Sequence, residues 1–273
     1  MKKVTALLIA LLMVLTLVPV WSIADANSLT VSFYATTDMH GRSAQYDVST
    51  AKEDVNSMVR VASVISEARS AYGEDNVLVV DNGDTFQGNL LAQYAATIKN
   101  QEENPMTTAL KYIGYDMFVT GNHEYNYLPS VRDRQMLLLE DAGIDVLGAN
   151  LTLVEDGTNL LGQQVKAGDS FYKPYALKTF TNEAGKSATI AVIGITNANC
   201  DGWDSSQNFP NLKCYSAGNE ERLLEVEIQK WVDYINTNED ADLIIVSAHS
   251  GYGSSSLESQ VINGVQNSSG VAI

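Results

Sequence analysis

The chain has 273 residues, a length that suits one large domain or two small ones. Because 45% of the residues are hydrophobic and 18% are charged, the composition indicates a packed core and excludes an intrinsically disordered chain. The 33 acidic residues outnumber the 17 basic ones, and the formal net charge of −16 disfavours binding to nucleic acid polymers and to anionic membranes.

Residues 1–26 have the pattern of a secretory signal peptide. Two lysines precede an apolar run over residues 4–20, and the small residues Ala24 and Ala26 stand where a signal peptidase cleaves. The alternative is a retained membrane anchor, because the apolar run is about long enough to span a bilayer. We expect cleavage after Ala26, a mature domain over residues 27–273 without stable membrane insertion, and a secreted, periplasmic or cell-surface location.

Strands and helices alternate through the first half of the chain. Residues 29–35 alternate apolar and polar side chains and predict a strand. The following segments predict a helix over 57–72, a strand over 77–80, a helix over 105–113, a strand over 117–119, a helix over 128–142 and a strand over 146–149. The Asn104-Pro105 pair is typical of a helix start. Each helix is followed by a glycine, the residue that commonly ends helices.

The second half predicts a hairpin, a helix and a last strand. Strands over 172–180 and 189–195 flank a turn at 182–185, an amphipathic helix follows over 220–235, and residues 243–246 form a buried strand. We find no internal repeat and no low-complexity linker in the sequence. The pattern predicts an α/β protein with a mixed sheet, in which ligands bind beyond the carboxyl ends of the strands.

The chain has two cysteines, Cys200 and Cys214. In an exported protein they could form a disulfide, and the alternative is two free thiols. We favour the disulfide because of the export signal. The segment between them is rich in Asp, Asn, Ser and Gly, so we expect a long surface loop there.

Each of the three histidines lies just past an apolar strand. They are His40 in the sequence TDMHG, His123 in GNHE and His249 in SAHSG. A fourth strand, over 77–80, ends in the sequence DNGD, whose last residue is Asp84. Four strand ends would therefore bring carboxylates, an amide and three imidazoles toward one edge of the sheet.

The side chains after the first two strands suit divalent cations. Asp38 and His40 are two residues apart, so they can converge only if the chain turns there, and Gly41 permits such a turn. Asp84 has two carboxylate oxygens and could bridge two cations. Cations about 3.5–4 Å apart can clamp a phosphate and lower the pKa of a shared water.

The later side chains extend this site. Asn122 offers a carbonyl oxygen and His249 an imidazole nitrogen, and this mixed set suits Mn, Fe, Zn or Co. His123 could donate a proton to a leaving alkoxide or stabilise charge on a phosphate. Because the acidic surface repels a small phosphate substrate, bound cations would supply the positive charge that the site needs.

Each motif has a simpler explanation when it is taken alone. Asp-x-His is a weak signal, a histidine after a strand is usually a hydrogen-bonded loop residue, and the sequences DNGD and GN could be tight turns. All three histidines nevertheless occur in the order Asp-x-His, Gly-Asp, Gly-Asn-His-Glu, His, and this combination predicts a metal site.

This order of motifs resembles the calcineurin-like metallophosphoesterase superfamily, from about Val31 to the end of the chain. The stretches TTDMH, VDNGDTFQG and GNHEYNY are most similar to its secreted nucleotidase branch, above all to the 2',3'-cyclic-nucleotide 2'-phosphodiesterases/3'-nucleotidases. The resemblance implies a four-layer α-β-β-α sandwich, two divalent metal ions and a small nucleotide substrate. It also implies His123 as the catalytic histidine and, as metal ligands, Asp38 and His40 for the first metal, a bridging Asp84, and Asn122 and His249 for the second.

Asn126 bears on the substrate. Many 5'-nucleotidases have an aspartate at this position, where it pairs with the catalytic histidine, whereas the cyclic-phosphodiesterase branch tends to have asparagine. An asparagine cannot stabilise an imidazolium by charge, as an aspartate does. The residue therefore argues modestly against a plain 5'-nucleotidase.

The superfamily's last motif, Gly-His-x-His, does not occur in the sequence. It would add one histidine to each metal, and a C-terminal domain would hold the nucleoside base. We therefore expect a truncated chain whose sandwich is incomplete at the C-terminus. The leading hypothesis is metal-dependent hydrolysis of nucleotide phosphate esters. The alternatives are a 5'-nucleotidase or nucleotide-sugar hydrolase, and a secreted, non-catalytic protein that binds a metal or another ligand.

Overall fold

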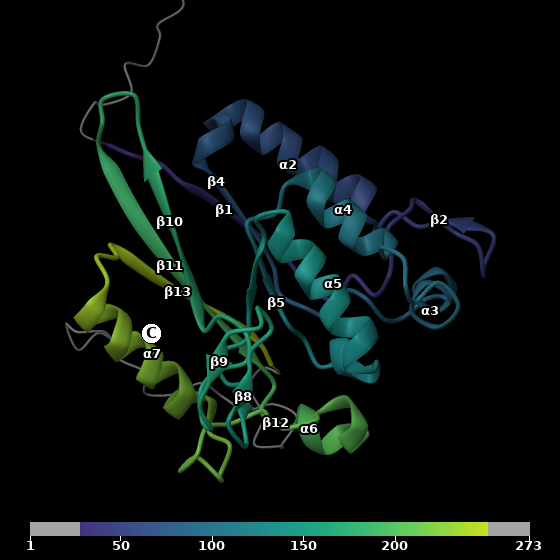
Figure 1. Cartoon of the computed structure of the whole chain (residues 1–273). Coiled ribbons are helices and arrows are strands. Elements are labelled where there is room, and N and C mark those ends of the chain that lie inside the picture. Colours follow the sequence, from purple (N-terminus) through teal and green to yellow (C-terminus); the bar gives the residue numbers. More distant parts are fainter. Residues whose placement is uncertain (1–27, 251–273) are drawn as a thin grey trace, which may run out of the picture.

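The computed structural model describes residues 28–250 (Figure 1). The predicted signal peptide and the last residues of the sequence, 251–273, lie outside this range. Within residues 28–250, no helix combines the length and the apolar character that are needed to cross a membrane.

The first sheet is parallel and has the strand order β1-β4-β5-β6. Its strands are β1 (Ser32–Thr36), β4 (Val77–Asp81), β5 (Met117–Val119) and β6 (Asp145–Leu147). The helices α2 (Met58–Tyr72), α4 (Pro105–Ile113) and α5 (Pro129–Asp141) lie together on one face of this sheet (Figure 1). Because the strands are parallel, all four carboxyl ends lie at the same edge.

The second sheet has the order β10-β11-β13. Strands β10 (Tyr175–Thr181) and β11 (Ser187–Thr196) form the predicted antiparallel hairpin, and β13 (Leu243–His249) runs parallel to β11. Helix α7 (Leu224–Asn238) covers the face that points away from the first sheet (Figure 1).

Alternating side chains in the central strands explain the layers. In β4, Val79 packs with the helices α2, α4 and α5, whereas Val80 packs between the two sheets. In β11, Val192 faces the first sheet, whereas Ile193 packs with α7 residues such as Ile228. Successive side chains of a strand point to opposite faces, so each buried strand contributes to two layers of core. The α/β fold with mixed sheets and four layers, α-β-β-α, is therefore confirmed.

Several short elements were not predicted. They are the hairpin β2 (Tyr46–Asp47) and β3 (Lys52–Glu53), helix α3 (Leu90–Thr97), strands β7 (Thr152–Leu153), β8 (Gly157–Thr158), β9 (Gln164–Val165) and β12 (Leu212–Lys213), helix α6 (Cys200–Trp203), and the 3-10 turns η1 (Glu74–Asn76), η2 (His123–Asn126) and η3 (Ser206–Asn208). Helix α3 escaped prediction because its buried residues are all alanines, which give a weak hydrophobic period.

Two boundaries differ from prediction for identifiable reasons. Helix α7 begins at Leu224 rather than at residue 220, because Arg222 has a positive φ of 58° that breaks a helix. Strand β13 continues to His249 rather than ending at residue 246, because it pairs with β11 as far as the register Thr196↔His249.

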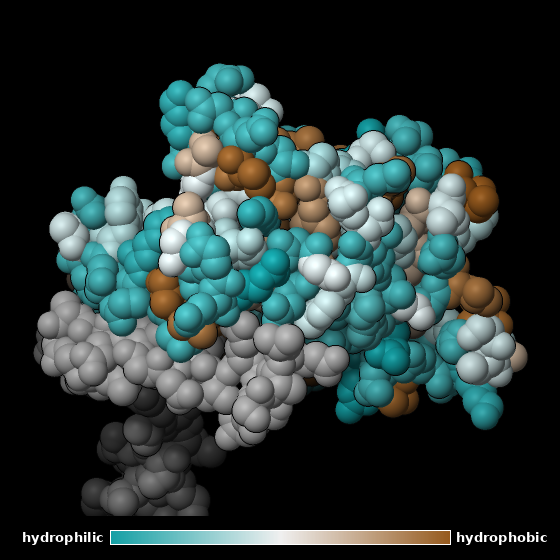
Figure 2. Space-filling view, turned by 90° about the horizontal axis from the view of Figure 1, so that it is seen from below, coloured by the Kyte–Doolittle hydropathy of each residue, from teal (hydrophilic) through white to brown (hydrophobic). Residues whose placement is uncertain are grey.

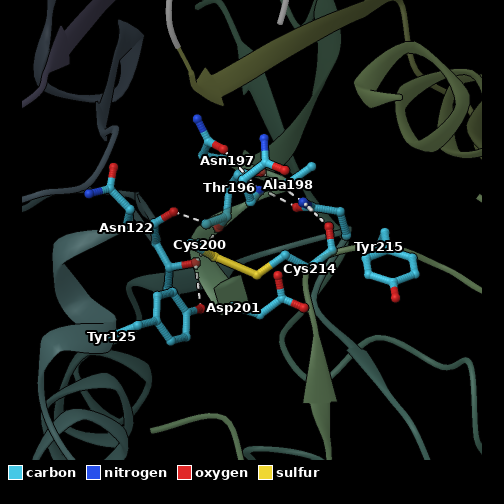
Figure 3. Close-up of a disulfide and its surroundings, with 12 residues drawn as sticks. Asn122, Tyr125, Thr196, Asn197, Ala198, Cys200, Asp201, Cys214 and Tyr215 are labelled. Atoms are coloured by element: carbon cyan, nitrogen blue, oxygen red, sulfur yellow. Dashed lines mark hydrogen bonds between the residues drawn. A yellow bond between two sulfur atoms is a disulfide. The ribbon is translucent and has the colours of Figure 1, made fainter. Parts of the chain in front are cut away.

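Cys200 and Cys214 form a disulfide (Figure 3). The expected surface loop between them is wrong in part, because the segment holds α6, η3 and β12 and buries Phe209 and Leu212. Strand β12 pairs with β7. Closing a loop with a sequence separation of 14 residues restricts the unfolded chain, which in the chain-entropy account stabilises the fold by about 3 kcal/mol.

Figure 2 views the molecule from the end at which the strands of the first sheet have their carboxyl ends. The coloured residues on this face are mostly hydrophilic, and the hydrophobic ones lie in separate patches. Single exposed apolar residues are ordinary on a protein surface. The described part of this face therefore suits a polar ligand rather than an apolar one.

Candidate metal centre

The carboxyl ends of four strands meet at one cluster of side chains. Asp38, Asp84 and Asn122 follow β1, β4 and β5, and His249 is the last residue of β13 in the other sheet. One ligand atom from each of Asp38, Asp84 and His249 lies within 4.8 Å of the others. His249 Nε2 lies 3.2 Å from Asp84 Oδ2 and 3.1 Å from Asn122 Oδ1.

The two remaining histidines adjoin this cluster. His40 Nε2 lies 3.7 Å from Asp38 Oδ1, and His123 Nε2 lies 4.0 Å from Asp84 Oδ2. The rings of His40 and His123 face each other edge-on, with centroids 5.5 Å apart. All the residues that sequence reasoning selected for the metals and for catalysis are therefore close together.

Asn82 fastens the second sheet to the first at this cluster. Its side-chain amide donates to the carbonyl of Ala248 over 3.1 Å, and its side-chain oxygen accepts from Ser247 Oγ over 2.8 Å. Its backbone oxygen lies 2.6 Å from His249 Nδ1. These three bonds bring His249 from the second sheet to the strand ends of the first.

The backbone around the cluster is strained. Asp38, His40 and Asp84 have positive φ angles of 55°, 47° and 55°, in the left-handed region that disfavours side chains. Only six non-glycine residues of the described chain adopt such angles, and three of them are here. The backbone N–H groups of residues 38, 40 and 41 donate to the carbonyls of residues 83, 84 and 85, so each loop holds the other in this conformation. Such strain concentrates at functional sites.

Two glycines allow the loops to approach closely. A Cβ on Gly83 would lie 2.3 Å from the backbone nitrogen of Gly121, and a Cβ on Gly121 would lie 2.4 Å from that of Asp84. Gly83 also has a φ of 87°. The glycines of the sequences DNGD and GNHE therefore bring two strand-end loops into contact, and they do not form β-hairpin turns.

Glu124 joins the same two loops and was not assigned a role from sequence. Its buried carboxylate accepts backbone hydrogen bonds from residues 84, 85, 86 and 121, at 2.7–3.2 Å. Burial and the nearby charge of Asp84 raise the pKa of Glu124, while the backbone donors oppose this shift. The signal that could have revealed it is the position of this acidic residue in the GNHE motif, directly after Asn122 and His123.

Asp84 and His249 form a buried ion pair. Burial lowers the pKa of His249, but the hydrogen bond and charge of Asp84 outweigh this effect and raise the pKa to about 9. Burial alone would raise the pKa of Asp84. Its contacts with His249 and with the backbone of His123 outweigh this effect, so the pKa lies below the ordinary value of an aspartate. The carboxylate is therefore ionised and is balanced by positive charge at the His249 ring.

Asp81 is a second buried carboxyl group, behind the cluster. It accepts hydrogen bonds from Thr36 Oγ1, Thr85 Oγ1 and the backbone of Gly83, at 2.6–3.1 Å. Desolvation by burial raises the pKa of Asp81 from 3.8 to about 7. Because the folded state holds this proton more tightly than the unfolded chain does, ionisation of Asp81 opposes folding as the pH rises through this interval.

We expect Asp81→Asn to remove this pH dependence. Relative to the wild type, the variant should gain free energy of unfolding as the pH rises from about 4 to about 7, by an amount on the order of 4 kcal/mol at about 1.4 kcal/mol per pKa unit. Urea unfolding of both proteins at several pH values, in the presence of a chelator, measures the difference. A difference between the two proteins that stays constant with pH would contradict this account.

A model of the calcineurin-like phosphoesterase family matches residues 31–272, most of the chain. The chain is 28% identical over 243 residues to the trifunctional nucleotide phosphoesterase protein YfkN of Bacillus subtilis, covering 83% of this chain and 14% of that protein. It is 28% identical over 227 residues to a 2',3'-cyclic-nucleotide 2'-phosphodiesterase/3'-nucleotidase of Haemophilus influenzae, covering 80% of this chain and 30% of that protein. The chain thus spans less than a third of the length of these two relatives.

Solved structures share the fold. The crystal structure of the calcineurin-like phosphoesterase YfkN from Bacillus subtilis superposes with a TM-score of 0.65 and 26% identity, covering 86% of this chain and 66% of that one. A putative 5'-nucleotidase from Staphylococcus aureus superposes with a TM-score of 0.62 and 24% identity, covering 81% of this chain and 38% of that one. As the order of its motifs predicted, this chain belongs to the calcineurin-like phosphoesterase family.

Proposed function

We propose that this chain hydrolyses phosphate esters of nucleotides, as a 2',3'-cyclic-nucleotide 2'-phosphodiesterase/3'-nucleotidase, with two divalent cations at the strand-end cluster. The position of His249 Nε2 within 3.2 Å of oxygens of both Asp84 and Asn122 carries this proposal. The names of the relatives from Bacillus subtilis and Haemophilus influenzae support the substrate class.

The donor groups fit divalent metal ions. His40 Nδ1 lies 2.8 Å from the carbonyl of Gln87, and His249 Nδ1 lies 2.6 Å from the carbonyl of Asn82. A carbonyl only accepts, so each Nδ1 carries a proton and each Nε2 faces the cluster, as is usual for metal-binding histidines. The mixture of carboxylate, amide and imidazole donors suits Mn, Fe, Zn or Co.

We assign Asp38 and His40 to the first metal, Asp84 to the bridging position, and Asn122 and His249 to the second metal. When bound, the cations supply Lewis acidity toward a phosphoryl oxygen and lower the pKa of water. Because His249 must give up its Nε2 proton to bind a metal, metal affinity should rise with pH. Asp84 suits the bridging position because one of its oxygens lies within 4.8 Å of ligand atoms of both Asp38 and His249, which are assigned to different metals.

We assign His123 to proton transfer. Its side chain keeps 37% of its surface exposed, so it can reach a substrate, and its Nε2 points toward the cluster. Its Nδ1 lies 2.6 Å from Asn126 Oδ1, and its backbone N–H donates to Asp84 Oδ1 over 2.7 Å. Held in this way, the ring can donate a proton to the alkoxide that leaves the phosphate.

We also propose export of the protein, to the periplasm, the cell surface or the medium. The pattern of residues 1–26 supports cleavage of a signal peptide. A disulfide is ordinary in such oxidising compartments and rare in the cytosol, so the bond between Cys200 and Cys214 supports the same location.

Release of phosphate or nucleoside tests the proposed reaction. With manganese, we expect the chain to turn over 2',3'-cyclic AMP and 3'-AMP faster than 5'-AMP, and His123→Ala to lower these rates by at least about a hundredfold. A preference for 5'-AMP would instead indicate a 5'-nucleotidase. Metal binding without turnover of any nucleotide would refute hydrolysis and favour a non-catalytic binding protein.

A further inference from the structure

A hydrogen-bonded chain of three side chains ends at His123. Its Nδ1 lies 2.6 Å from Asn126 Oδ1, and Asn126 Nδ2 donates to Asp204 Oδ2 over 2.5 Å. His123 and Asn126 begin and end the turn η2, whereas Asp204 lies 78 residues beyond Asn126, directly after α6. The metal cluster and the catalytic assignment do not use Asp204.

Asp204 decides which way the amide of Asn126 points. An ionised carboxylate can only accept hydrogen bonds, so the amide must turn its NH2 group to Asp204 and its oxygen to His123. That oxygen in turn only accepts, so Nδ1 of His123 must carry the proton. In the neutral ring, Nε2 is then the unprotonated nitrogen that faces Asp84, so it is Nε2 that takes up the proton which the imidazolium form donates to the leaving alkoxide.

Several contacts fix the position of the segment that carries Asp204. Asn208 Nδ2 donates to Asp204 Oδ1 over 3.3 Å, and the backbone oxygen of Asn208 accepts from the buried Arg132 of α5 over 2.7 Å. Phe209 stacks on Tyr125 of η2, with ring centroids 4.7 Å apart. The disulfide closes the same segment, and Figure 3 shows it in the surroundings of Tyr125.

We propose that Asp204 is a positioning residue for His123 and that it acts through Asn126. Asp204 fixes the orientation of the Asn126 amide, and this amide fixes the tautomer and the direction of the His123 ring. The ring then carries out the proton transfer that we assign to His123. This inference rests on the proposed function, because the rates that it predicts are those of nucleotide hydrolysis.

An exchange of acid and amide tests this role in the full chain. In Asp204→Asn the two amides can pair in either direction, so kcat for 3'-AMP should fall by about tenfold while KM changes little. In Asn126→Asp two carboxylates face each other, and activity should also fall. The double variant Asn126→Asp/Asp204→Asn places a carboxylate directly on Nδ1 of His123 and an amide donor behind it, so it should recover most of the wild-type kcat.

The leaving group separates positioning from general damage. p-Nitrophenyl phosphate has a leaving group that needs no proton, so its kcat should fall much less in Asp204→Asn than that of 3'-AMP. Asp201→Asn is the matched control, because Asp201 lies in the same segment but pairs with Arg222. If Asp201→Asn loosens the segment, it should lower kcat for 3'-AMP and for p-nitrophenyl phosphate by the same factor, so the ratio of the two rates should stay unchanged.

Nitrogen-15 NMR of the His123 ring tests the inference independently of turnover. In the neutral ring of the wild type we expect a proton on Nδ1, and in Asp204→Asn a mixture of both tautomers. If the wild type hydrolyses no nucleotide, the proposed function fails while this spectrum still tests Asp204. An unchanged tautomer in Asp204→Asn, or a double variant no better than the worse single variant, would overturn the inference.

Discussion

Asp84→Asn should lower the turnover of nucleotides by at least about a thousandfold while the fold remains. The side chain of Asp84 is only 5% exposed, and its two oxygens serve different partners. Oδ1 accepts from the backbone of His123, which an asparagine oxygen can also do, whereas Oδ2 faces His249. The substitution therefore removes the charge and one metal-facing oxygen. Asparagine tolerates the left-handed backbone of this position, so the loss would reflect chemistry rather than folding.

The measurement combines kcat for 2',3'-cyclic AMP in manganese with the metal content of the desalted protein. Asp47→Asn is the control for the exchange of acid for amide, because the side chain of Asp47 accepts hydrogen bonds only from Ser49 and Thr50 among the described residues, in the exposed β2–β3 hairpin. It should leave both values unchanged. If Asp84→Asn kept more than about a tenth of the wild-type rate, the proposed bridging role would be wrong.

Helix ends that carry explicit signals could be predicted from the sequence. Helix α4 begins at Pro105 and ends at Ile113, as expected, because the side chain of Asn104 caps the first turn and Gly114 adopts the left-handed conformation after the last. The α/β fold class could also be inferred, since apolar strands alternate with amphipathic helices, whereas the four layers were expected only from the resemblance of the motifs to a family. The hairpins β2–β3 and β8–β9 could not, because their strands are two residues long and too short for a period.

The residues of the candidate site could be predicted because three of them follow parallel strands, whose ends share an edge. Their arrival at one cluster with His249 required information that the sequence pattern lacks. His249 belongs to the other sheet and reaches Asp84 through the contacts of Asn82 with Ser247 and Ala248, more than 160 residues away in the sequence. No spacing rule relates residues so far apart.

The supporting residues were missed for the same reason. Asp204 contacts Asn126 across 78 residues, and Glu124 contacts residues 84–86 across 38–40 residues. Neither role produces a periodic pattern in the sequence, because each role depends on how two loops meet in the folded protein. Sequence reasoning therefore identified the side chains of the candidate metal cluster more readily than the side chains that hold them in place.

Glu124→Gln should show how much the backbone hydrogen bonds accepted by Glu124 contribute to stability and to catalysis. Each oxygen of Glu124 accepts two backbone N–H groups, so an NH2 group in place of either one leaves two buried donors facing a donor. At about 1–3 kcal/mol for each unsatisfied group, the free energy of unfolding should fall by about 2–6 kcal/mol. Because the loop of Asp84 would shift, kcat should also fall by about a hundredfold.

Glu227→Gln is the matched control for that variant. Glu227 is equally buried, but its Oε1 alone accepts hydrogen bonds, from Ser216 and Asn219, and its Oε2 has no hydrogen-bond partner among the described residues. A glutamine can keep these bonds, so its stability and kcat should stay much closer to the wild type. Urea unfolding and kcat of both variants decide the matter. Equal losses in the two would mean that burying a glutamate, rather than joining two loops, sets the cost.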